Sequence, residues 1–201
     1  MSKRSLSTRD AAESIETIRS VLDRTTRYTH ISWAGIAMAG MSAAVAGAAG
    51  SVSEVSPIAL PSRFLLLWSA GLAVAVAFGF WTTARKARAA RERFWSRKLQ
   101  VVTLGFLPSL VLAAIVTALL LDVGRLDLVP GLWMGLYAVG ILSVCHVLDW
   151  EFQLTGWAFL LLCSVSLFLL RASPNAAMTV GFGGIHLALG GFRFFKERRW
   201  E

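Results

Sequence analysis

Long apolar stretches alternate with short polar loops along the whole of this chain. A helix of about 20 apolar residues is long enough to cross the hydrocarbon core of a bilayer. The pattern therefore predicts an all-α membrane protein whose six transmembrane helices form a bundle over residues 31–192. The six predicted spans are 31–50, 63–83, 100–121, 131–148, 153–170 and 176–192.

The basic residues predict how these spans are oriented. If the chain starts in the cytoplasm, its cytoplasmic pieces are residues 1–30, 84–99, 149–152 and 193–201. These pieces hold 17 of the 20 Lys and Arg residues, and Arg63, Arg125 and Arg171 are the other three. Cytoplasmic loops of membrane proteins carry an excess of Lys and Arg. We therefore expect both termini in the cytoplasm, with residues 193–201 as a basic tail.

Composition agrees with a membrane domain and limits the choice of partners. Hydrophobic residues make up 56% of the chain and charged residues 16%, compared with about 45–50% and about 25% in soluble domains. The net charge of +8 would suggest nucleic acid for a soluble protein. Here most basic residues lie where membrane insertion places them, so nucleic acid is not the expected partner. Cys145 and Cys163 lie in apolar stretches without CxxC spacing, which is typical of unpaired thiols.

Residues 8–29 predict a cytoplasmic amphipathic helix before the first span. Its apolar stripe is narrow and consists of Ala11, Ile15, Ile18, Leu22 and Thr25. The charges on this helix are balanced, whereas a helix that binds a lipid surface is cationic. The stripe favours packing on another helix, either on the bundle itself or on a partner. That partner is a second copy, which gives a homo-oligomer, or a cytoplasmic protein.

Small residues recur in the first and sixth predicted spans. Gly35, Ala39, Ala43 and Gly47 form one row in the first span, and the sixth span contains several glycines between Gly181 and Gly191. Small side chains let helix backbones approach closely in lipid. We therefore expect these two spans to be tightly packed helices.

The loop between the second and third spans is strongly basic. Its basic residues are Arg85, Lys86, Arg88, Arg91, Arg93, Arg97 and Lys98. Its alanines predict that the second helix continues into this loop. Each such charge beside a membrane attracts anionic lipid by about 1 kcal/mol. Contact with anionic lipid on the cytoplasmic face is the predicted role, and a phosphorylated ligand is the alternative.

The histidines are the candidate site residues. No Asp, Glu, Lys or Arg lies in the middle of a predicted span, which argues against a cation-driven transporter. His186 lies deepest, about 10 Å of helix rise from Arg193. His146 lies beside Cys145 and three residues before Asp149, a spacing that places His146 and Asp149 on one helix face. His30 lies at the inner end of the first span.

These donors define the ligand chemistry that is open to the chain. Histidine, thiol and carboxylate groups bind zinc or copper, and two histidines on facing helices ligate haem. A histidine inside a bundle more often forms a hydrogen bond between helices. No cofactor is predicted and the metal question stays open. The chain lacks a phosphate-binding glycine loop, HExxH and GxSxG, so no catalytic residues are predicted and an enzyme is not expected.

Two segments resemble a known group of proteins. The stretch from Thr17 to Trp33, which includes Arg19-Ser20-Val21-Leu22-Asp23, is similar to the amino-terminal part of small bacterial multi-pass membrane proteins with no assigned activity. The segment Gly181-Phe182-Gly183-Gly184-Ile185-His186-Leu187 and the basic tail resemble their end. The resemblance implies a location in the bacterial cytoplasmic (inner) membrane and no particular chemistry.

Two functions fit these observations. The first is a membrane-embedded interaction or sensing component. The alternative is a small-solute transporter or channel with a polar site near His186. A transporter needs a polar cavity near the middle of the membrane, bordered by His186, Thr103, Ser109 and Thr117. A bundle packed solidly by small residues, with an exposed amphipathic helix, favours the interaction function.

Overall fold

The computed structural model describes residues 13–17, 28, 31–91, 93–171 and 173–199. Within these residues the structure is helical and contains no strand. The long helices are α2 (Trp33–Val52), α3 (Pro61–Ala89), α4 (Arg97–Asp122), α5 (Val129–Val144), α6 (Trp150–Phe168) and α8 (Ile185–Arg198). The shorter elements are η1 (Leu126–Leu128), η2 (Cys145–Val147), α7 (Pro174–Met178) and the π-helix η3 (Thr179–Gly184).

Five helical segments in the described residues are long and apolar enough to cross a membrane. They are Trp33–Val52, Pro61–Ala89, Arg97–Asp122, Leu126–Val147 and Trp150–Phe168. The predicted sixth span is not a single α-helix, because α7, η3 and α8 divide it. Glycines weaken a regular helix, and η3 contains Gly181, Gly183 and Gly184. The described residues thus contain five single-helix spans of the predicted kind, and the sixth predicted span is divided among three elements.

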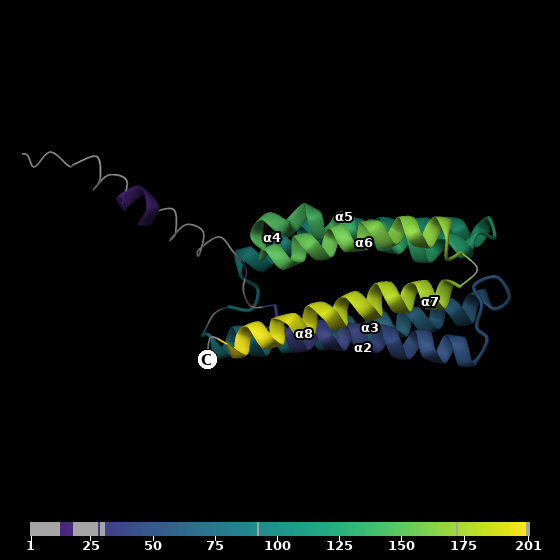
Figure 1. Ribbon diagram of the computed structural model, residues 1–201, viewed down its shortest axis with the longest axis horizontal. Coiled ribbons are helices and arrows are strands. Elements are labelled where there is room, and N and C mark those ends of the chain that lie inside the picture. Colours follow the sequence, from purple (N-terminus) through teal and green to yellow (C-terminus); the bar gives the residue numbers. More distant parts are fainter. Residues whose placement is uncertain (1–12, 18–27, 29–30, 92, 172, 200–201) are drawn as a thin grey trace, which may run out of the picture.

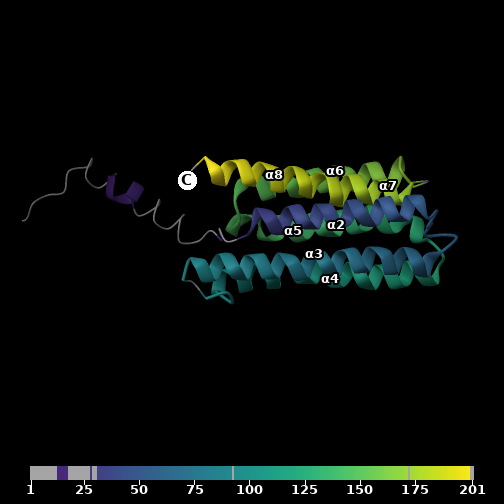
Figure 2. The same cartoon turned by 90° about the horizontal axis from the view of Figure 1, so that it is seen from below.

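The long helices form two layers (Figure 1). One layer contains α3, α2 and α8 with α2 in the middle, and the other contains α4, α5 and α6 with α5 in the middle. Figure 2, turned by 90°, shows α8 over α6, α2 over α5 and α3 over α4. The described residues of 85–98 and 193–199 lie together at one end of the bundle, with the connection from α5 to α6. We call this end the basic end.

Glycines set the packing inside the first layer. A Cβ added to Gly40 on α2 would lie 2.7 Å from the backbone nitrogen of Leu187. A Cβ added to Gly190 on α8 would lie 2.9 Å from the backbone nitrogen of Ala37. Real side chains do not fit at such distances, so these backbones approach because the residues are glycine. The first span and the last segment are closely packed helices, and at these positions they pack against each other.

Aromatic rings fill the space between the two layers. Tyr137 of α5 packs edge-on against Phe159 of α6, with ring centroids 4.8 Å apart, and against Phe182 of η3 at 5.3 Å. Phe106 of α4 also packs edge-on against Tyr137, with ring centroids 5.1 Å apart. Phe159 is fully buried. The centre of the bundle is therefore a packed aromatic core.

The end opposite the basic end is closed by indole and amide hydrogen bonds. Trp68 of α3 donates to Asn175 of α7 at 3.1 Å, and Asn175 donates to the carbonyl of Val55 at 2.7 Å. Arg125 donates to Asp127 at 2.9 Å, and this hydrogen bond raises the pKa of the Arg125 guanidinium. The basic charge of Arg125 is therefore compensated at this end.

The predicted helix at residues 8–29 falls largely outside the described residues. Residues 13–17 are helical and exposed, and Ile15 of the predicted stripe is 65% exposed. Tyr28 is buried, and its backbone nitrogen donates to the carbonyl of Val147 at 2.8 Å. In the described part, this segment contacts the bundle at Tyr28 while residues 13–17 are exposed.

Candidate functional site

Both ring nitrogens of His186 have hydrogen-bond partners, and one of these partners lies in the other layer. Its Nδ1 lies 2.8 Å from the carbonyl of Phe182, one turn earlier, and its Nε2 lies 2.8 Å from the hydroxyl of Tyr137. A carbonyl oxygen can only accept, so Nδ1 carries the proton. In the neutral ring, Nε2 then accepts a hydrogen bond from the Tyr137 hydroxyl. Both nitrogens have protein partners, and the bond to α5 crosses from one layer to the other.

Aromatic rings surround His186. The ring of Phe182 stacks on it at 18° with a centroid distance of 6.2 Å, and Phe159 lies edge-on at 5.5 Å. His186 is 8% exposed. This geometry is that of a histidine that forms a hydrogen bond between helices. The hydrogen bond to Tyr137 holds the two layers in a fixed relative orientation. A ligand that binds the ring would have to displace Tyr137 or the Phe182 carbonyl.

A second polar cluster lies at the basic end, two turns of α8 beyond His186. Arg193 Nη1 donates to Asp149 Oδ2 and to Glu151 Oε1, both at 3.0 Å. Lys196 Nζ donates to Glu151 Oε1 at 2.8 Å. Arg193 also lies over the ring of Phe152, 5.2 Å from its centroid. We call Asp149, Glu151, Arg193 and Lys196 the ion cluster.

The ion cluster is electrically balanced, with Arg193 and Glu151 buried and Asp149 and Lys196 half-buried. Arg193 is 5% exposed and Glu151 is 4% exposed. Two carboxylates face two cations, which is the condition under which charges are tolerated in a low-dielectric interior. Two buried atoms, Arg193 Nε and Glu151 Oε2, have no hydrogen-bond partner among the described residues. The cluster therefore keeps one free donor and one free acceptor.

Sequence reasoning missed Glu151 and Arg193 as site residues. The sequence pattern predicts Arg193 as the first residue of the basic tail and Asp149-Trp150-Glu151 as a loop between two spans. The available signal was the spacing of seven between His186 and Arg193, which places both on one face of α8. The sequence does not indicate which loop this face of α8 contacts, so the contact with Glu151 could be found only from the tertiary structure.

The other predicted site residues lie apart from His186. His146 is exposed in η2 and Cys145 is half-buried. His146 and Asp149 are not on one helix face, because α5 ends at Val144 and Asp149 is the extended residue that precedes α6. Asp149 joins the ion cluster instead. His30 lies outside the described residues. Across the part of the chain that the structure describes, no group of three or more His, Cys, Asp or Glu residues is placed to hold a metal ion.

The predicted basic loop lies at the end of α3 and the start of α4, where α3 continues to Ala89 as its alanines predict. Arg85, Arg88, Arg91, Arg93 and Arg97 are exposed. Lys86 pairs with Glu197 of α8 at 2.7 Å, and the Arg85 guanidinium lies 5.2 Å from the ring centroid of Trp81. The exposed arginines can contact anionic groups, whereas Lys86 ties α3 to α8.

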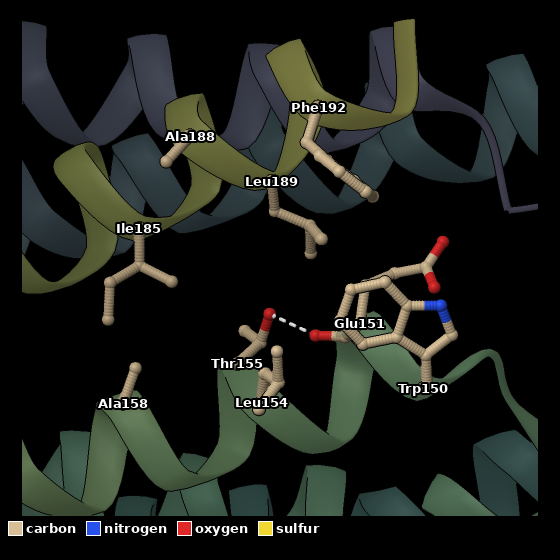
Figure 3. Close-up of a pocket in the computed structure, with 9 residues that line it drawn as sticks. All are labelled: Trp150, Glu151, Leu154, Thr155, Ala158, Ile185, Ala188, Leu189 and Phe192. Atoms are coloured by element: carbon tan, nitrogen blue, oxygen red, sulfur yellow. Dashed lines mark hydrogen bonds between the residues drawn. The ribbon is translucent and has the colours of Figure 1, made fainter. Parts of the chain in front are cut away.

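Among the described residues, two hollows are close enough to the predicted site residues to be considered as ligand sites. One, of about 300 Å³, is a crevice between α6 and α8, and Glu151 lines one end of it (Figure 3). The other, of about 230 Å³, is lined by Tyr28, Ile31 and residues of α3 and α4 that include Thr83 and Thr103. His186 lines neither hollow.

The chain was compared with protein-family models, with curated proteins and with solved structures, and no match was found.

Proposed function

We propose that this protein is a six-span membrane protein of the bacterial cytoplasmic membrane that acts as an interaction or sensing component. Five apolar helices and the filled core around His186 support this function. The observation that carries the proposal is the contrast between that closed core and the exposed helical residues 13–17. The protein then presents an external helix to a partner and uses the bundle as its anchor.

The sixth crossing is formed by α7, η3 and α8 together. These elements follow one another without a break from Pro174 to Arg198, over 25 residues. At about 1.5 Å per residue, this run is about 37 Å long and exceeds the hydrocarbon core of about 30 Å. It lies along α2 in the first layer. A π-helix inside such a run is a local widening of the helix and does not end it.

Both termini are proposed to lie in the cytoplasm. The described basic residues from Arg85 to Lys98 and from Arg193 to Arg199 belong to the basic end. Arg63 lies in the first turn of α3, at its opposite end from Arg85, and Arg125 and Arg171 lie in the connections after α4 and α6. The orientation is tested by fusing alkaline phosphatase or a fluorescent protein to the carboxyl terminus. We expect fluorescence and no phosphatase activity. An active phosphatase would overturn the proposed orientation.

The interaction surface is proposed to be residues 8–29, with the exposed arginines of the basic loop on anionic lipid beside it. The partner is a second copy or a cytoplasmic protein. Place a photo-crosslinking amino acid at Ile15, which is 65% exposed, and as a control at Leu66, which is 71% exposed on α3. We expect Ile15 to crosslink to a defined protein band and Leu66 to crosslink to lipid. No protein band from Ile15 in living cells would contradict the proposal.

The transporter or channel alternative requires a polar cavity at His186. Tyr137, Phe159 and Phe182 occupy the space around that ring. Thr103 borders the smaller hollow, together with mostly apolar side chains. This arrangement supports the interaction function over a solute pathway through His186.

A further inference from the structure

The crevice between α6 and α8 has the shape and lining of a site for a hydrocarbon chain. It measures about 300 Å³. Its apolar lining residues are Leu154, Ala158, Ile185, Ala188, Leu189 and Phe192 (Figure 3). The rim faces outward, since Leu154 is 58% exposed and Phe192 is 46% exposed. In a bilayer this rim faces lipid, so an acyl chain can enter the crevice from the side.

One end of the crevice is polar. Figure 3 shows the Glu151 carboxylate between the two helices, at the end marked by Trp150 and Phe192. Its Oε1 accepts from Arg193 and Lys196, while its Oε2 is buried without a partner among the described residues. A buried carboxylate oxygen without a donor is costly, so this position favours a ligand that brings an N–H or O–H group.

A cation lies next to this free acceptor. The Lys196 ammonium has three N–H groups, of which one is directed to Glu151 Oε1 at 2.8 Å. The Lys196 side chain is 37% exposed. It therefore has donors left for an anionic group that approaches from outside. Trp150 stands at the same end, 54% exposed, where an indole is typical of the membrane–water interface.

We propose that the crevice binds one aminophospholipid of the phosphatidylethanolamine class. Its acyl chain lies along Leu154, Ala158 and Ala188, its primary ammonium donates to Glu151 Oε2, and its phosphate lies on Lys196. The pairing follows from charge complementarity, because this end of the crevice offers a free carboxylate oxygen of Glu151 and, 2.8 Å from the other oxygen of the same group, the Lys196 ammonium. A choline headgroup carries the same charge but has no N–H to donate. This site goes beyond the proposed interaction function and does not depend on it.

Native mass spectrometry of the purified full-length protein tests the proposal. The protein is equilibrated with equal amounts of phosphatidylethanolamine, phosphatidylcholine and phosphatidylglycerol that share the same acyl chains. We expect phosphatidylethanolamine to be retained about tenfold more than phosphatidylcholine, because a hydrogen bond to a charged group is worth at least a factor of ten. Glu151→Gln should reduce this preference.

A pair of matched variants locates the site. Ala158→Phe fills the crevice and leaves the ion cluster in place, whereas Ala114→Phe adds the same ring to an exposed position on α4. We expect Ala158→Phe to abolish the preference for phosphatidylethanolamine and Ala114→Phe to keep it. If Glu151→Gln fails to fold, Ala158→Phe still tests whether phosphatidylethanolamine binds in the crevice.

Three results would overturn the proposal. Equal retention of the three lipids, or retention of none, would show that Glu151 Oε2 has no lipid donor and is hydrated. Preference for phosphatidylglycerol would show that positive charge alone selects the lipid. An unchanged preference in Ala158→Phe would show that the retained lipid lies elsewhere on the bundle.

Discussion

The last helical segment has two faces that hold the bundle together by different physical means. Towards α2 it presents Gly183 and Gly190, where backbones touch directly. Towards α5 and α6 it presents His186 and Arg193, which form hydrogen bonds and ion pairs across the layers. Apolar side chains gain no hydrophobic energy by association inside lipid, so packing and specific polar bonds must supply the contact. One face sets how closely the helices pack, and the other sets which helices meet.

The largest effect is expected at the ion cluster. Arg193→Ala removes one partner and leaves Glu151 buried with reduced compensation, which costs about 3–5 kcal/mol of the free energy of unfolding. Arg199→Ala is the control, because Arg199 is exposed at the end of the same helix. Unfolding in mixed micelles, followed by circular dichroism, measures both. Equal stability of the two variants would mean that the polar face does not hold the layers together.

Smaller changes in the free energy of unfolding, of opposite sign at Gly190 and Gly191, are expected on the face of α8 that packs against α2. Gly190→Ala should lose about 1–3 kcal/mol, because its Cβ meets the backbone of Ala37 and the helices must shift. Gly191→Ala has open space and should gain up to about 1 kcal/mol from the better helix propensity of alanine. The same unfolding assay applies. A stabilised Gly190→Ala would show that close backbone contact does not define this face.

The smallest change in the free energy of unfolding is expected when Tyr137 and His186, the two partners of the buried hydrogen bond, are both replaced. Tyr137→Phe alone should cost about 1–3 kcal/mol, because it leaves His186 Nε2 buried without a donor. Adding His186→Phe removes the unsatisfied nitrogen, so the double variant should be nearly as stable as the parent. A double-mutant cycle measures this coupling. Additive losses would indicate that the two residues act independently.

Much of the fold could be predicted from local patterns. The first predicted span, 31–50, agrees with α2 within two residues at each end, and the alanines after the second span predicted the extension of α3 to Ala89. Hydrophobic length and helix propensity are local properties, so they can be read without knowing the neighbours. The break at η3 was not predicted, because a π-helix depends on how the widened turn packs.

The candidate site, like the fold, could be predicted only in part from local patterns. The sequence by itself determined that His186 lies inside an apolar segment and that 17 of the 20 Lys and Arg residues lie in the terminal segments and the loop between the second and third spans. Only the tertiary structure decided that His186 meets Tyr137, and that Arg193 meets Glu151 across 42 residues. The physical reason is that a periodic pattern defines the face of one helix, whereas the partner of that face is set by the packing of all the helices together.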